Sequence, residues 1–193
     1  MRAVRFLLVI LILFIGCTHN NSTQRALRQD KFLIMAQRPT PATYPQSILD
    51  NIEHIESMPF DGMFVNAPVC RRVMNGKPVS YETIKGELGI LKGAFKKFKH
   101  NFLYIFTDFP GDFWDDEVWA ITAQNFANMA RMARELEFVG IVYDNEEYLD
   151  GKWFNYKEDY ENPLYNLNEH AEQAKLRGRQ IMQAMTAESP PSK

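Results

Sequence analysis

The chain has 193 residues, of which 46% are hydrophobic and 13% aromatic, and its formal net charge is −2. This composition is sufficient for one well-packed domain and excludes a disordered or low-complexity protein. The slightly acidic balance gives no support to a nucleic-acid-binding role.

The N-terminus has the pattern of an export signal. Arg2 and Arg5 precede an apolar run at 6–15, and Gly16 and Cys17 follow it. The apolar run is too short for a membrane-spanning helix. An uncleaved anchor and an ordinary signal peptide are the alternatives to a lipoprotein signal.

Residues 14–17, Phe-Ile-Gly-Cys, resemble the bacterial lipoprotein signal, in which the cysteine is acylated and becomes the new N-terminus. The resemblance implies that 1–16 are removed and that Cys17 is lipidated. The protein would then sit on a membrane surface of the bacterial cell envelope, at the outer membrane or the periplasmic face. Cys70 would be the one remaining cysteine, and we expect it to be a buried or strand-end thiol without a nucleophilic role.

Beyond the lipid anchor, residues 17–29 are polar and are expected to form a tether. We place a partial barrel domain at 30–187 and a Pro-rich tail at 188–193. The domain has four successive strand-then-helix patterns. In chain order these are strand 32–36 and helix 46–57, strand 63–66 and helix 81–99, strand 102–106 and helix 115–137, and strand 139–143 and helix 168–187.

Four such β/α units predict an α/β fold with parallel strands and helices packed outside. A doubly wound nucleotide-binding sheet is disfavoured, because the turn after the first strand, 37–41, has no glycine. A TIM (β/α)8 barrel typically needs about 250 residues, whereas signal cleavage leaves 193 − 16 = 177. The expectation is therefore half of a TIM barrel. It could be a truncated or split gene product, a fragment completed by a missing C-terminal half, or a half that dimerises. The first two are favoured because a half barrel exposes strand edges.

In barrels, functional side chains gather at the carboxyl ends of the strands. Asp144 and Glu146 share one face of the fourth strand, since side chains alternate along it. Two neighbouring carboxylates suit acid/base chemistry, with Glu146 as the proton donor and Asp144 as its supporting neighbour. The expected substrate-binding residues at the same mouth are Arg38, Asn66, Asp108, Trp114, Asn145, Tyr148 and Trp153, the aromatic ones by stacking on sugar rings.

The segment 138–146, Phe-Val-Gly-Ile-Val-Tyr-Asp-Asn-Glu, resembles the fourth-strand signature of chitinase-class glycoside hydrolases. Val139 and Val142 stand where that family has Asp. The Asn145–Glu146 pair also resembles the retaining barrel glycosidases whose fourth strand ends in Asn-Glu. Both resemblances imply that Glu146 is the general acid/base and that the substrate is a carbohydrate. In the second clan the nucleophile lies on a seventh strand, so this chain alone would be inactive.

Other interpretations remain open for the acidic segment 144–147. It could be a solvated loop, or it could hold Ca²⁺ or Mg²⁺ together with Asp108, although no EF-hand spacing is present. A non-catalytic surface lipoprotein that binds a glycan or a protein partner is the alternative to an enzyme. We expect no cofactor and no metal.

Overall fold

The computed structural model describes residues 31–37, 40–106, 112–144 and 164–188. The predicted signal, Cys17, the tether and most of the Pro-rich tail lie outside these ranges. All helices and strands below belong to the compact unit that begins at Leu33, which is described by itself. In the described ranges, no helix combines the length and apolar character needed to cross a membrane.

The described strands form a four-stranded parallel sheet in the order β1-β2-β3-β4. They are β1 (Ile34–Met35), β2 (Gly62–Val65), β3 (Phe102–Phe106) and β4 (Gly140–Asp144). The predicted α/β class and the parallel strands are confirmed. Because the order is sequential, every connection steps in the same direction, and right-handed crossovers then place the helices on one face.

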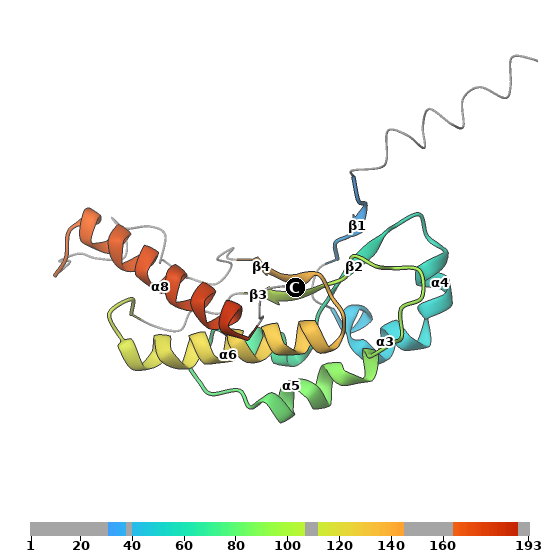
Figure 1. Cartoon of the computed structure of the whole chain (residues 1–193), viewed down its shortest axis with the longest axis horizontal. Coiled ribbons are helices and arrows are strands. Elements are labelled where there is room, and N and C mark those ends of the chain that lie inside the picture. The colour runs from blue at the N-terminus through green and yellow to red at the C-terminus, as the bar shows by residue number, and fades with distance from the viewer. Residues whose placement is uncertain (1–30, 38–39, 107–111, 145–163, 189–193) are drawn as a thin grey trace, which may run out of the picture. The chain divides into compact units, whose positions relative to one another are not determined.

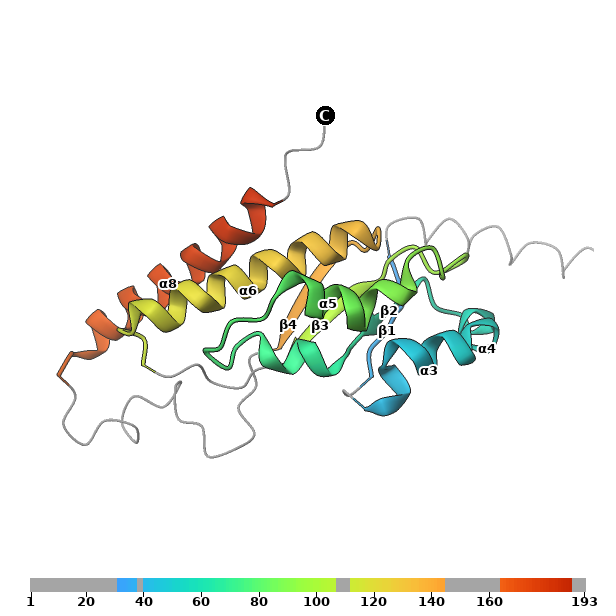
Figure 2. The same ribbon diagram turned by 90° about the horizontal axis from the view of Figure 1, so that it is seen from below.

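The helices are α3 (Pro45–Asp50), α4 (Ile52–Ser57), α5 (Tyr81–Leu88), α6 (Asp116–Glu135) and α8 (Leu167–Ala187). Figures 1 and 2 show α3, α5 and α6 on the same side of the strands. Polar side chains cap the N-termini of α5 and α6. Ser80 Oγ accepts from the Thr83 amide, and Asp115 Oδ1 accepts from the Val118 amide.

The two faces of the sheet carry different side chains. Met63, Val65, Leu103 and Ile105 are at most 1% exposed and form the core under the helices. The opposite face is lined by half-buried or buried apolar and aromatic residues, namely Phe64, Phe102, Tyr104, Phe106 and Val142. No described helix packs on that second face, although parallel sheets are normally covered on both.

One predicted helix is wrong in its extent. The periodicity predicts a helix over 81–99, but α5 ends at Leu88 and is followed by a 3-10 turn, Gly89–Leu91. Gly93 then adopts a φ of 70°, which is a left-handed conformation. Phe98 is still a core residue, at 1% exposed, but it reaches the core from a loop.

That loop is held by a carboxylate from α4. Glu56 Oε1 accepts from the backbone amides of Lys96, Lys97 and Phe98 at 2.9, 2.6 and 2.8 Å. The Lys97 ammonium donates to the carbonyls of Glu56 and Met58, both at 2.8 Å. Lys97 therefore caps the carboxyl end of α4.

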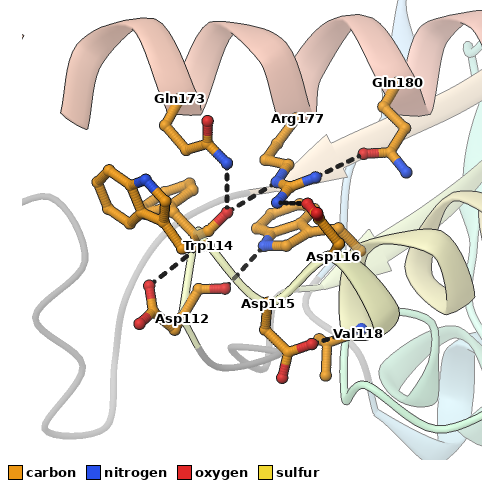
Figure 3. Close-up of polar contacts among 10 residues, drawn as sticks. Asp112, Trp114, Asp115, Asp116, Val118, Gln173, Arg177 and Gln180 are labelled. Atoms are coloured by element: carbon orange, nitrogen blue, oxygen red, sulfur yellow. Dashed lines mark hydrogen bonds and ion pairs between the residues drawn. The ribbon is translucent and has the colours of Figure 1, made fainter. Parts of the chain in front are cut away.

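Helix α8 is attached to the N-terminal end of α6 by a buried arginine (Figure 3). Arg177 is 4% exposed and donates from Nε to the Phe113 carbonyl at 2.7 Å and from Nη2 to Asp116 at 2.5 Å. Gln173 donates to the same Phe113 carbonyl at 2.9 Å. The guanidinium carbon also lies 5.8 Å from the centre of the Trp119 ring.

Candidate functional site

Polar side chains meet at the carboxyl end of the sheet, where the sequence places the functional residues. Asp144 is the last residue of β4 and is in register with Phe106, the last residue of β3. Asn66 directly follows the end of β2. Since β2, β3 and β4 are adjacent and parallel, these ends lie at one edge of the sheet.

Tyr104 joins the two predicted residues. Its hydroxyl donates to Asp144 Oδ2, and its backbone carbonyl accepts from Asn66 Nδ2 at 2.9 Å. The backbone N–H of Asn66 in turn donates to the Thr43 carbonyl at 3.3 Å, on the segment that follows β1. These hydrogen bonds link β4, β3, the residue after β2 and the segment after β1.

Asn66 has an unused acceptor. Its side chain is 1% exposed, and its Oδ1 atom makes no hydrogen bond within the described part of the chain. A buried carbonyl oxygen without a partner costs free energy, about 1–3 kcal/mol. Oδ1 is itself buried, so a hydroxyl or a water molecule would reach it only if neighbouring groups moved.

Aromatic rings and one cation surround these polar groups. Phe64 stacks on Tyr104 with ring centres 5.6 Å apart and planes 9° apart. The Arg71 guanidinium lies 5.5 Å from the centre of the Phe106 ring, and Arg71 comes from the 3-10 turn Pro68–Arg72 beyond β2. The carboxyl end of the sheet thus combines a carboxylate, an amide, a phenol and a guanidinium with the aromatic side chains of one sheet face.

Sequence reasoning missed Tyr104 and Arg71. Tyr104 is a hydroxyl-bearing residue in an otherwise apolar strand, on the same face as Phe102 and Phe106. That alternation, applied to the third strand as well as the fourth, was the signal that could have found Tyr104. Arg71 follows the second strand at a distance that carries no comparable signal.

The structure brings together two of the predicted site residues, Asp144 and Asn66. The other candidates from the acidic and aromatic loops lie outside the described residues: Arg38, Asp108, Asn145, Glu146, Tyr148 and Trp153. Their predicted roles stay predictions.

Trp114, predicted to stack on sugar, already has aromatic neighbours. Its ring stacks on Tyr165 with centres 4.0 Å apart and planes 5° apart, and it meets His170 edge-on at 4.5 Å. Figure 3 shows its backbone beside Asp112, whose carboxylate accepts from the Trp114 amide at 3.0 Å. One face of the indole is thus occupied by the protein itself.

The thiol of Cys70 is buried and unsuited to nucleophilic chemistry. Cys70 is 0% exposed, and burial raises the pKa of its thiol to about 12. The expectation of a buried thiol is confirmed. In the parts of the chain that the structure describes, no three His, Cys, Asp or Glu side chains are grouped to hold a metal ion.

No protein-family model, curated protein or solved structure matches the chain. The function must therefore be argued from the residues at the carboxyl end of the sheet.

Proposed function

We propose that the protein is an exported, lipid-anchored, glycoside-hydrolase-like barrel protein that acts on a glycan, with Glu146 as general acid/base and Asp144 as its supporting carboxylate. The observation that carries the proposal is the position of Asp144. It ends the fourth parallel strand and accepts a hydrogen bond from the hydroxyl of Tyr104, whose backbone carbonyl accepts from Asn66.

Each group at the mouth has a role in this proposal. Tyr104 orients the Asp144 carboxylate, which stabilises positive charge that develops at the sugar carbon. Asn66 and Arg71 supply an acceptor and donors for sugar hydroxyls. Glu146 is two residues beyond Asp144, and strand alternation would give both carboxylates the same direction. Glu146 then protonates the leaving oxygen.

A retaining mechanism also needs a nucleophile from a later strand of a closed barrel. The proposal therefore treats the four-stranded sheet as half of a barrel. Activity requires the other half, which either a C-terminal portion or a second polypeptide supplies.

Replacement of Glu146 by Gln in the complete protein, in which this chain is joined by the other barrel half, tests the catalytic role. We expect cleavage of oligosaccharides to fall by about 100-fold or more while glycan binding is kept, because general acid/base catalysis typically contributes that much. Glu147→Gln is the matched control and should keep cleavage, since alternation turns Glu147 to the other face. Absence of cleavage by the unmutated complete protein, with both barrel halves present, across a polysaccharide panel would refute the enzyme, and retained binding would then favour a glycan-binding lipoprotein.

The proposed anchor has a separate test. Cells grown with a labelled fatty acid should incorporate the label into the protein, and Cys17→Ala should abolish the incorporation. Unlabelled protein would refute lipidation and would leave an uncleaved anchor or an ordinary signal peptide as the interpretation of the N-terminus.

A further inference from the structure

The β4 edge is apolar and has no second partner strand in the described part of the chain. β4 pairs with β3, and no described strand lies on its other side. Val139, which is 57% exposed, and the β4 residues 140–143 contain no charge and no proline, and the charge in β4 is Asp144 at its carboxyl end. Natural edge strands usually carry charged residues or proline, because an edge without them pairs with strands of other chains. We therefore expect this edge to pair with another strand.

A groove runs beside that edge on the helix side of the sheet. A cavity of about 480 Å³ lies between β4, α6 and α8, and its apolar lining includes Ala133, Ile141, Met182 and Met185. Met182 is 56% exposed, although it is a large apolar side chain. In successive β/α units a helix covers the seam between its own strand and the next one. In the described part of the chain, no strand lies in the seam beside α8.

The opposite edge of the sheet has a matching groove. β1 pairs with β2, and Leu33 at its start is 47% exposed. A cavity of about 300 Å³ lies beside β1 under α3 and α4, and its apolar lining includes Met35, Ile55 and Met58. In a closed barrel this seam would be covered by the helix that precedes β1. Among the described residues, the groove beside β1 has no covering helix and the seam covered by α8 has no strand beside β4.

We propose that two copies of this chain join edge to edge, with β4 of each copy paired in parallel with β1 of the other, so that eight strands close into one barrel. Met182 of α8 then enters the groove beside the second copy's β1. The charges also match. Arg179 is exposed one turn before Met182, and Asp50 is exposed on α3 beside the groove residues Ser47 and Asn51.

A second copy accounts for both edges at once. A two-fold axis along the barrel gives two identical contacts, and all strands stay parallel. Closure removes every edge and covers the aromatic faces that carry Phe64, Phe102 and Phe106. A strand from an unrelated polypeptide would fill the β4 edge and leave β1 open. The dimer rests on the barrel interpretation of the sheet but needs nothing of the proposed glycosidase chemistry.

Native mass spectrometry of the full-length protein, in detergent, tests the dimer. The uncleaved chain has a mass of 22.5 kDa, and the dimer should have twice the mass of whichever single chain, cleaved or uncleaved, the sample contains. Met182→Lys should weaken the dimer by about 100-fold, as expected for an anchor residue at the centre of an interface. The matched control is Leu167→Lys, because Leu167 is also on α8, is 59% exposed and lies outside the groove. Circular dichroism should show both variants folded.

Exchanging the charges at positions 179 and 50 tests whether the β1 edge of the second copy is the one that β4 contacts. Arg179→Asp and Asp50→Arg should each weaken the dimer, and the double variant should recover it. A single-chain mass for the unmodified protein at micromolar concentration would refute the proposal and leave the β4 edge to another polypeptide. A dimer indifferent to Met182→Lys and to both charge variants would refute it as well. Glycan cleavage is measured separately, so a dimer without activity contradicts the proposed function alone.

Discussion

Arg177 fixes the position of α8, and its removal gives the most direct test of how this helix is held. Its Nε hydrogen bond to the Phe113 carbonyl is buried and charge-assisted, and such bonds contribute about 1.5–3 kcal/mol. The pair with Asp116 adds less, about 0–1 kcal/mol, because the Asp116 side chain is 89% exposed. Arg177→Met keeps the packing of the aliphatic stem and should lower the free energy of unfolding by about 2–3 kcal/mol.

Thermal unfolding followed by circular dichroism measures this loss. For a chain of this size, each kcal/mol lowers Tm by roughly 2–4 °C, so a decrease of about 4–12 °C is expected. The difference should persist at about 1 M salt, since buried contacts are screened little. Lys175→Met is the control on the same helix, because its ion pair with Glu172 is exposed and should contribute less than about 0.5 kcal/mol. Equal melting of the two variants would refute the role assigned to Arg177.

Three further predictions concern other parts of the fold. Glu56→Gln weakens the hydrogen bonds to three backbone amides. It should lower the free energy of unfolding by about 1–3 kcal/mol and speed amide hydrogen exchange at 96–98. Glu53 is exposed, so Glu53→Gln should change neither quantity. The folded state binds the Cys70 proton more tightly than the unfolded state. The contribution of this thiol to stability should therefore be fully present below pH 9.0 and be lost as the pH rises towards about 12. Cys70→Ala should make that alkaline loss shallower, and an unchanged pH profile would contradict the cause given. Tyr104→Phe keeps the stack on Phe64 but loses the hydroxyl that donates to Asp144. The rate of glycan cleavage should therefore fall about 10-fold or more, with Tm nearly unchanged. An unaffected rate would show that Tyr104 does not belong to the site.

Local patterns predicted the elements well where local interactions decide them. The helix over 115–137 is α6, because its apolar stripe and the Asp115 cap agree. The helix over 81–99 failed because Glu56, about 40 residues earlier in the chain, supplies hydrogen bonds that compete with helix formation. The apolar spacing within 81–99 carries no information about a carboxylate at position 56. The single helix over 46–57 is likewise divided at Asn51, whose side chain donates to the Ser47 carbonyl at 2.9 Å.

The candidate site was predictable only in part, for a related reason. Asp144 and Asn66 were found because each directly follows an apolar strand. Their connection through Tyr104 depends on the strand order and register, which fix the neighbours of β3. A single sequence does not contain the register of a parallel sheet, because its strands are joined by long crossovers rather than tight turns.

Gly62 offers a way to recognise distant relatives of this chain. A Cβ atom at this position would lie 2.0 Å from the His100 carbonyl oxygen, which is backbone and cannot move aside. Any protein that keeps this sheet must therefore keep glycine at the start of its second strand. Together with the amide at 66 and the tyrosine at 104, Gly62 defines a spaced pattern that could be searched for where overall sequence similarity has faded.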